Sequence, residues 1–402
     1  MELAFPLARL LTFNMLNIYE KTHQRVPLLL WMERLEDLEE GALQQALNLT
    51  QLPFAHHHIA LMPDAHQGYG MPIGGVLAAK NAIIPYAVGL DIGCGMRVAE
   101  TAIPIKNLSR QKIDLYLKQI GRAIPQGFDW HKKPQKHPIF DELPGDVGIL
   151  TDEAKNVRHQ LGTLGGGNHF IEFQSDENGI LWVMIHSGSR NIGKKVAEHF
   201  HHRAVKLCRA RGENLPSSEL SYFPFDSGHG QEYFRAMSWC QKFSRTNREK
   251  MMEVILDVIS ESPRQIIDIH HNYAALENHF GEQVVIHRKG AIKAEKGVIG
   301  VIPGSMGTHS YIVQGLGFAD AFNSSAHGAG RKMGRRQAKR SIPVERVLRE
   351  MEQKGITLQT EFLKDLPEEC SEVYKDIDYV IQQQKDLVKV KVKLKPIAVL
   401  KG

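Results

Sequence analysis

Short apolar runs that end in glycine turns recur along most of this chain, and many of the turns carry a polar side chain. The run at 180–188, ILWVMIHSG, has the pattern of a buried strand that ends in such a turn. Similar strand patterns occur at 54–78, 266–274, 283–290 and 297–305. Helical spacing of apolar residues lies between them, at 33–51, 105–124, 194–211 and 231–260. Strand and helix patterns that alternate along one chain predict an α/β protein.

No internal repeat, low-complexity linker or break in composition divides the 402 residues. The segments 124–147 and 213–230 are polar and indicate loops, and the basic stretch 385–402 alternates like a strand. The sequence therefore predicts one large α/β unit over residues 1–402, with helical insertions, although the length alone would allow two or three domains.

The charge balance gives only a weak signal for a nucleic-acid partner, because 50 basic residues face 45 acidic ones. The basic residues are concentrated locally instead. The segment RKMGRRQAKR at 331–340 holds six basic residues and no acid. On a helix, Arg331, Arg335 and Lys339 would share one stripe. Such a stripe suits nucleic-acid phosphates, and the alternative is an ordinary solvated helix face.

The four cysteines and the apolar runs indicate the environment of the protein. No two cysteines have CxxC spacing, so we expect reduced thiols. No run reaches the ~18 apolar residues that a membrane-spanning helix needs. The N-terminal segment lacks the basic start and cleavage site of a signal peptide. We therefore expect a cytoplasmic protein without a membrane partner.

Many side chains that can bind a metal or transfer a proton stand beside glycines at predicted strand ends. They are Asp64, His66, Asp91, Cys94, Asn168, His169, His186, Ser187, Arg190, His271, Asn272, His287, Arg288, Lys289 and His327. Carboxylate, thiolate and imidazole groups together suit one or two sites for zinc, manganese or iron, and spacing alone does not choose among these metals. The dense histidine tracts at 56–58 and 199–202 are expected to be structural or solvated.

The segment around His327 has features of a phosphate site. Its sequence HGAG, at 327–330, is followed by the basic segment that is predicted to be helical. Backbone N–H groups and the positive end of a helix would then lie beside a reactive imidazole, which suits an anionic phosphate. The turn GSRNIG at 188–193 lacks the GK[ST] ending of a Walker loop, and no dinucleotide-binding GxGxxG is present.

Six motifs in order identify a resemblance to a known family. They are MPDAHQGYGMPIGGV, VGLDIGCGMR, LGTLGGGNHFIEF, HRKGA, PGSMGT and HGAGR. Together they resemble the RtcB family of RNA-splicing and RNA-repair ligases, from about Leu16 to Gly402. The resemblance implies a single large α/β fold with mixed sheets. Residues 1–15 diverge from the family opening, and Gly334 and the segment 368–376 also depart from the family pattern.

The resemblance implies an activity and its cofactors. Such enzymes join RNA 3′-phosphate or 2′,3′-cyclic phosphate ends to 5′-hydroxyl ends, with GTP, two Mn²⁺ ions and a histidine–GMP intermediate. By motif position, His327 would be the nucleophile and Cys94 would bridge the two metals. His169 and His186 would complete one metal site, and Asp91 and His271 the other.

The remaining site residues are also assigned by the resemblance. The nucleotide would contact Asn168, Glu172, Asn272, Ser305, Ala329, Gly330, Tyr374 and Lys401. The RNA ends or the leaving phosphate would contact Asp64, Arg190, Lys289 and Arg335. The RNA would come from tRNA splicing or RNA repair, and archease is a possible activating partner in this family.

Two other functions stay open at this stage. One is a metal-dependent phosphohydrolase or cyclic phosphodiesterase that acts on RNA ends without guanylylation. The other is a catalytically silent protein that binds RNA ends. A hydrolase needs neither a nucleophilic His327 nor a guanine clamp that includes Lys401. The roles of these two residues therefore distinguish the ligase hypothesis from the alternatives.

Overall fold

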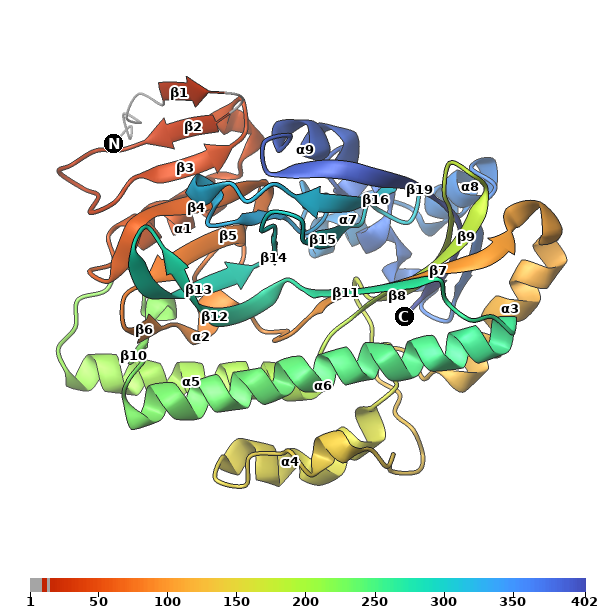
Figure 1. Cartoon of the computed structure of the whole chain (residues 1–402), viewed down its shortest axis with the longest axis horizontal. Coiled ribbons are helices and arrows are strands. Elements are labelled where there is room, and N and C mark those ends of the chain that lie inside the picture. Colours follow the sequence, from red (N-terminus) through yellow and green to blue (C-terminus); the bar gives the residue numbers. More distant parts are fainter. Residues whose placement is uncertain (1–8, 13–14) are drawn as a thin grey trace.

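The computed structural model describes residues 9–12 and 15–402 of the protein, and within them the chain is a mixed α/β fold, as predicted (Figure 1). Most strand pairs are antiparallel, whereas β3 (Leu28–Trp31) with β4 (Ala55–His66), and β18 (Thr357–Thr360) with β19 (Val388–Lys401), are parallel. The divergent segment predicted at 1–15 falls mostly outside the described residues. That residues 1–402 form one domain stays a prediction.

The first large sheet is built from the N-terminal strands together with a later hairpin. Its strands, in spatial order, are β1 (Arg9–Thr12), β2 (Met15–Ile18), β3, β4, β5 (Ile73–Ala79), β13 (Glu282–Lys289) and β12 (Asn272–His279). The segment from β4 to β5 contains the motif MPDAHQGYG, and the two glycines of this motif lie in the turn between the strands. This sheet therefore carries Asp64 on β4 and Lys289 at the end of β13.

The second large sheet joins the middle of the chain to its C-terminus. Its strands, in spatial order, are β11 (Gln265–His270), β7 (Gly95–Pro104), β9 (Ile180–Ser187), β8 (Phe170–Ser175), β19, β16 (Ser310–Gly315) and β15 (Ile299–Ile302), with β18 beside β19. Two small sheets pair β6 (Ala82–Ile83) with β10 (Phe223–Pro224), and β14 (Ala291–Lys293) with β17 (Ser324–Ala326).

Helices surround these sheets, and the two long ones, α5 and α6, run side by side along one side of the molecule (Figure 1). The helices are α1 (Glu40–Thr50), α2 (Pro85–Val88), α3 (Arg110–Ala123), α4 (Gly148–Gln160), α5 (Arg190–Ala210), α6 (Gly228–Ile259), α7 (Arg335–Ser341), α8 (Val344–Gln353) and α9 (Ile377–Gln383). Short 3₁₀ turns lie at Leu35–Asp37, Ile105–Asn107, Pro138–Phe140, Ser218–Leu220, Ala319–Ala321, Leu363–Glu369 and Ser371–Val373. Among the described residues, no helix is both long enough and apolar enough to cross a membrane.

Helix α6 supports the second sheet and so fixes its position. The Ser227 hydroxyl accepts a hydrogen bond from the Gly230 N–H, which satisfies a free donor at the start of the helix. The helix ends at Ser260, which adopts the left-handed conformation. Its buried residues Met251 and Ile255 belong to the core that covers β8 and β9. Helix α6 also contacts β7 and β9, and these contacts support the edge of the sheet where β7 begins and β9 ends.

The structure corrects several sequence predictions. The strand predicted over 266–274 is two strands, β11 and β12, which belong to different sheets. The predicted helix at 331–340 begins only at Arg335, because Gly334 has extended backbone, so Arg331 does not share a stripe with Arg335 and Lys339. Helix α1 begins at Glu40, after a separate 3₁₀ turn. Helix α4 was not predicted.

Candidate active site

One edge of the second sheet gathers most of the predicted metal ligands. In an antiparallel sheet, the start of one strand lies beside the end of its neighbour. The register pairs Gly95 at the start of β7 with Ser187 at the end of β9, and with His270 at the end of β11. Phe170, at the start of β8, pairs with His186. The residues that flank these ends, Cys94, His169 and His271, therefore meet at the same edge as His186.

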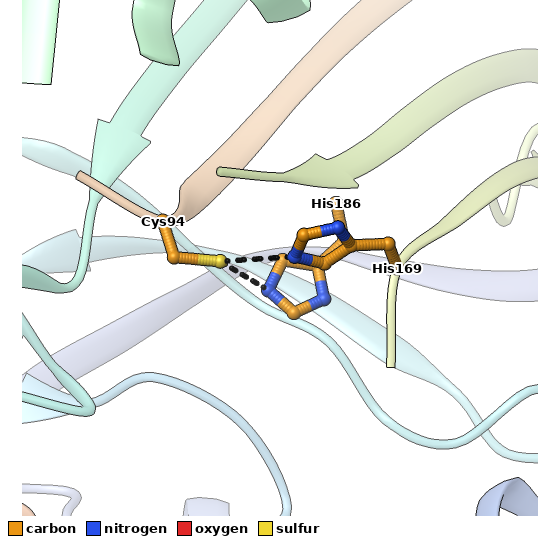
Figure 2. Close-up of side chains that lie close together, drawn as sticks. All are labelled: Cys94, His169 and His186. Atoms are coloured by element: carbon orange, nitrogen blue, oxygen red, sulfur yellow. Dashed lines mark hydrogen bonds between the residues drawn. The ribbon is translucent and has the colours of Figure 1, made fainter. Parts of the chain in front are cut away.

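Cys94 faces two of these histidines directly. Its Sγ atom lies 3.5 Å from Nε2 of His169 and 3.3 Å from Nε2 of His186, and Figure 2 shows the two rings converging on the sulfur. All three side chains are buried. Gly95 permits the close approach of β11 to this turn, because a Cβ atom at residue 95 would lie 1.9 Å from the carbonyl oxygen of Ile269.

The hydrogen bonds of the two histidines leave their Nε2 atoms suited to bind a metal. Nδ1 of His169 lies 2.9 Å from the carbonyl oxygen of Leu164, and Nδ1 of His186 lies 3.0 Å from that of Asn168. A carbonyl only accepts, so Nδ1 carries the proton when either ring is neutral, and Nε2 of His186 then keeps a lone pair. Nε2 of His169 also faces the Asp91 carboxylate at 3.1 Å, a contact that requires a proton or a metal cation between the two atoms. Such anchoring is typical of metal-ligating histidines. Burial lowers the pKa of His186 well below its usual value, which keeps the ring neutral.

Asp91 and His271 lie next to this cluster. Oδ2 of Asp91 is 3.1 Å from Nε2 of His169, and the other carboxylate oxygen accepts a hydrogen bond from the backbone N–H of Ser189. The His271 ring centre is 5.2 Å from that of His186, and its buried Nδ1 atom has no hydrogen-bond partner among the described residues. An unpartnered buried ring nitrogen, a thiol and a carboxylate together fit a transition-metal site.

A fully buried arginine on α6 braces the turns that carry these ligands. Nη1 of Arg248 donates to the carbonyl oxygen of Gly93, at 3.1 Å, and to that of Ser187, at 2.9 Å. Its Nη2 atom lies 2.7 Å from Asp268 on β11. Gly93 directly precedes Cys94, and Ser187 directly follows His186. Sequence reasoning missed Arg248, because nothing in the local pattern of α6 distinguishes it from a surface arginine.

His327 follows β17 and is oriented by Asp64 from β4. The Asp64 carboxylate is fully buried, and its Oδ2 atom lies 2.7 Å from Nδ1 of His327. The same oxygen accepts hydrogen bonds from the backbone N–H groups of His327 and Gly328, at 3.1 and 3.2 Å. Because the carboxylate only accepts, Nδ1 carries the proton and Nε2 keeps the lone pair. The His327 ring centre lies 4.7 Å from that of His271.

A cavity of about 800 Å³ connects the cluster with His327. Its volume lies within the ~300–1,000 Å³ that is usual for ligand pockets. The predicted residues that line it are Asp91, Cys94, Asn168, His186, His271, Asn272, Lys289, Ser305, His327, Ala329, Gly330, Arg335, Tyr374 and Lys401. The imidazole with a free Nε2 and the metal-type cluster thus open into the same space.

Comparison with known proteins identifies the family. A family model described as "tRNA-splicing ligase RtcB" matches residues 45–147 and 144–402. The chain is 38% identical to the RNA-splicing ligase RtcB of Escherichia coli (strain K12), over 95% of this chain and 98% of that protein.

The chain belongs to the RtcB family. It is also 32% identical to the tRNA-splicing ligase RtcB of Thermococcus kodakarensis, over 90% of this chain and 92% of that protein. The RNA-splicing ligase RtcB homolog 1 of Entamoeba histolytica is 31% identical over 90% of this chain and 84% of that protein. The resemblance inferred from the six motifs is thereby confirmed.

Within this RtcB-family site, the wall beyond His327 is built by the C-terminal part of the chain. The Tyr374 hydroxyl donates to Oε2 of Glu369, at 2.6 Å, and the guanidinium of Arg331 lies over the Tyr374 ring. Burial raises the pKa of Tyr374 well above its usual value. Lys401 donates to the carbonyl oxygens of Gly167 and His169. Glu369 and Arg331 line the cavity. Sequence reasoning missed Glu369 and placed Arg331 only on a basic helical stripe.

The residues predicted to contact RNA ends have different surroundings. Lys289 is buried, and its ammonium donates to the carbonyl oxygens of Tyr69, Met71 and Tyr86. Burial lowers the pKa of Lys289 to about 7. Arg335 is half-exposed at the rim of the cavity and lies 3.4 Å from Glu368. Its predicted role stays a prediction.

Four of the residues that the resemblance assigned to the site do not line the cavity, namely Asp64, His169, Glu172 and Arg190. Asp64 lies behind His327, and His169 lies within the cluster. Glu172 is buried on β8 beside Gln174, and burial raises its pKa to about 8. Arg190 donates to Thr163 and to the carbonyl oxygen of Gly127. The roles proposed for Glu172 and Arg190 therefore stay predictions.

His66 is a cavity residue that received no role from the sequence, although it stands two positions after Asp64. Burial lowers its pKa to about 4, so the ring is neutral. The dense histidine tracts lie outside the cavity. In the first tract, His58 stacks on Phe322, and in the second, His201 stacks on Tyr86.

Proposed function

We propose that this protein is a GTP- and Mn²⁺-dependent RNA ligase that joins RNA 3′-phosphate or 2′,3′-cyclic phosphate ends to 5′-hydroxyl ends. The observation that carries the proposal is the His327–Asp64 pair, whose remaining ring nitrogen opens into the same cavity as the Cys94 cluster. A hydrolase that uses a metal-activated water has no need of such a nucleophile. Membership of the RtcB family supports the same choice.

In the first step, Nε2 of His327 attacks the α-phosphorus of GTP. A P–N bond forms, the α–β phosphoanhydride bond breaks, and pyrophosphate leaves. The ring becomes cationic while its Nδ1 proton stays hydrogen-bonded to Asp64, so the buried carboxylate stabilises the charge that develops. The backbone N–H groups of His327 and Gly328 hold the carboxylate in place.

In the second step, an oxygen of the RNA 3′-phosphate attacks the GMP phosphorus. The P–N bond breaks, His327 returns to its neutral form, and the RNA ends in a 3′–5′ diphosphate linkage to guanosine. The 5′-hydroxyl of the other RNA then attacks the RNA phosphorus, loses its proton, and expels GMP. A 2′,3′-cyclic phosphate must first be opened by water to the 3′-phosphate, because the cyclic diester carries a single negative charge and its oxygens are weaker nucleophiles than those of the 3′-phosphate dianion.

We propose that two Mn²⁺ ions are held by Cys94, His169 and His186 on one side and by Cys94, Asp91 and His271 on the other. When bound, divalent ions neutralise phosphate charge and hold attacking and leaving oxygens in line. What supports this assignment is the hydrogen bonds that anchor His169 and His186 through Nδ1, and the unpartnered Nδ1 atom of His271 among the described residues. The preference for manganese over zinc comes from the family resemblance.

The nucleotide is proposed to occupy the wall that contains Tyr374, Lys401 and Ser305, together with Asn168, Asn272, Ala329 and Gly330. Burial lowers the pKa of Lys401, and its two carbonyl partners fix its position beside Asn168. We also propose that the RNA comes from tRNA splicing or RNA repair. Stimulation of guanylylation by archease would test whether that partner is needed.

The test uses two RNA oligonucleotides, one with a labelled 3′-phosphate and one with a 5′-hydroxyl, and Mn²⁺ with or without GTP. A ligase yields a joined product only when GTP is present, and the labelled phosphate becomes resistant to phosphatase. Loss of the 3′-phosphate without GTP and without a joined product would favour the phosphohydrolase instead. His327→Ala abolishes joining, whereas His23→Ala, at a side chain that is 76% exposed, serves as the matched control.

A further inference from the structure

The loop between α3 and α4 exposes two aromatic side chains beside the active site. Phe128 is 97% exposed and Trp130 is 39% exposed. Single exposed apolar residues are ordinary on protein surfaces, so exposure alone carries little weight. Here the two rings are separated by one residue and are followed by Lys132, Lys133 and Lys136, all exposed.

This loop carries a local excess of positive charge. Within residues 126–137 the only carboxylate is Asp129, against three lysines. Over residues 9–12 and 15–402, none of these three lysines lies within ion-pair distance of an acid. By contrast, Lys339 and Arg335 on α7 are both paired with Glu368. The loop lysines are therefore available to an external anion.

Hydrogen bonds place the aromatic turn next to the cavity. The N–H of Gly127 donates to the carbonyl oxygen of Gly165, at 3.0 Å, and Arg190 donates to the carbonyl oxygen of Gly127, at 3.1 Å. Gly165 belongs to the loop that carries Asn168 into the cavity and ends at the ligand His169. Phe128 is thus the next residue after a direct contact with an active-site loop.

Backbone hydrogen bonds also fix the turn on both sides of the two aromatic residues. The N–H of Leu164 donates to the carbonyl oxygen of Pro125, and the N–H of His131 donates to that of His159, both at 2.9 Å. Nδ1 of His159 bonds back to the carbonyl oxygen of His131, at 2.8 Å. Fixed ends limit the conformational entropy that the turn would lose on binding a ligand.

We propose that Phe128 and Trp130, with Lys132, Lys133 and Lys136, form an aromatic turn that binds the single-stranded RNA next to the ends that are joined. This inference rests on the proposed function. Aromatic rings stack on bases of any sequence, and lysines bind the phosphates between them. A protein partner would use an apolar patch with few charges at its centre, whereas here three unpaired lysines follow the rings.

The test measures RNA binding by fluorescence anisotropy, with a labelled single-stranded RNA that ends in a 3′-phosphate. Loss of one base–aromatic stack, of about 1 kcal/mol or more, weakens binding at least ~5-fold. We expect that loss in the double variant Phe128→Ala with Trp130→Ala. Tyr19→Ala is the matched control, because Tyr19 is 42% exposed and follows β2 in the other sheet.

The lysines give a second readout. For single strands, each neutralised phosphate contributes about −0.7 to the slope of log affinity against log salt concentration. Changing Lys132, Lys133 and Lys136 to glutamine should therefore make that slope shallower by about 2. A base-stacking surface without phosphate contacts would leave the slope unchanged, and that result would overturn the assignment of the lysines.

Self-guanylylation with labelled GTP separates this inference from the proposed function, because the turn does not line the cavity. We expect the aromatic double variant to be labelled as fast as the wild type, with an unchanged unfolding temperature. If the wild type is labelled and the double variant still binds RNA with wild-type affinity, the aromatic turn is not an RNA site. If the wild type is never labelled, the proposed function itself fails.

Discussion

The buried carboxylate of Asp64 offers the sharpest perturbation of the proposed nucleophile. Its Oδ2 atom accepts three hydrogen bonds, from Nδ1 of His327 and from the N–H groups of His327 and Gly328. Asp64→Asn keeps an oxygen that can accept all three, so the histidine stays in position. The substitution removes only the negative charge beside the ring, which becomes cationic when Nε2 attacks phosphorus.

The magnitude follows from the type of hydrogen bond that is lost. A hydrogen bond to a charged group contributes about 1.5–3 kcal/mol, against about 1 kcal/mol for a neutral pair. The barrier to guanylylation should therefore rise by about 0.5–2 kcal/mol, which slows the reaction about 2- to 30-fold. The new amide NH₂ would occupy the place of Oδ1, which is buried and has no partner, so the variant should also be less stable by about 1–3 kcal/mol.

The assay is single-turnover labelling of the protein by α-labelled GTP at saturating nucleotide. Asp386→Asn is the matched control, because Asp386 also accepts a hydrogen bond from an aromatic ring N–H, that of Trp31, at 3.0 Å, and does not line the cavity. Denaturation curves of both variants show that the labelled fraction is folded. Labelling of Asp64→Asn at the wild-type rate would refute the role given to this carboxylate.

Three further predictions concern the metal cluster, its support and acid stability. Cys94→Ala should lose bound Mn²⁺ in equilibrium dialysis while Cys208→Ala retains it, and full occupancy in Cys94→Ala would exclude the thiol as a ligand. Arg248→Met leaves the buried Asp268 with Arg97 as its remaining ion-pair partner and removes the donor to the carbonyl oxygens of Gly93 and Ser187, so it should lower the free energy of unfolding by about 2–3 kcal/mol. Arg235, on the same helix, forms an exposed ion pair with Asp146, so Arg235→Met should lower the free energy of unfolding by at most about 1 kcal/mol. Equal destabilisation by Arg248→Met and Arg235→Met would contradict the supporting role of Arg248. Burial opposes ionisation of Glu277, but hydrogen bonds from His279 and Arg288 outweigh it and lower the pKa of Glu277 to about 2. Its carboxylate therefore stabilises the protein above about pH 4.5, and this contribution is lost as the pH falls toward 2. Glu277→Gln should flatten the stability curve in that window, and an unchanged curve would refute the assignment.

The residues of the metal-type cluster were among the candidates named from the sequence, and the pairing of antiparallel strands explains why they meet. Cys94, His169 and His186 each stand beside a glycine turn or a strand end, and alternate strand ends fall at one sheet edge. The pattern also distinguished these residues from the dense tract at 199–202, in which His201 stacks on Tyr86. Residue type and position relative to a strand were therefore enough to include the cluster among fifteen candidates, whereas only the family resemblance singled out its three members.

The supporting contacts could not be predicted, because they join distant parts of the chain. Asp64 and His327 are 263 positions apart, and their pairing depends on how β17 lies against β4. The continuous apolar pattern of residues 266–274 predicts one strand. In the structure the chain instead passes from one sheet to the other at His271. Arg248 looks like any basic residue of a long helix until the fold buries it.

Locating the label within the protein shows whether His327 carries GMP. The protein is incubated with α-labelled GTP and Mn²⁺, digested under alkaline conditions that preserve a phosphoramidate, and mapped by mass spectrometry. We expect one labelled peptide, with GMP on His327, and an acid-labile bond that is absent from His327→Ala. Label on another residue, or no label with any divalent metal while RNA 3′-phosphate is still removed, would contradict this role of His327.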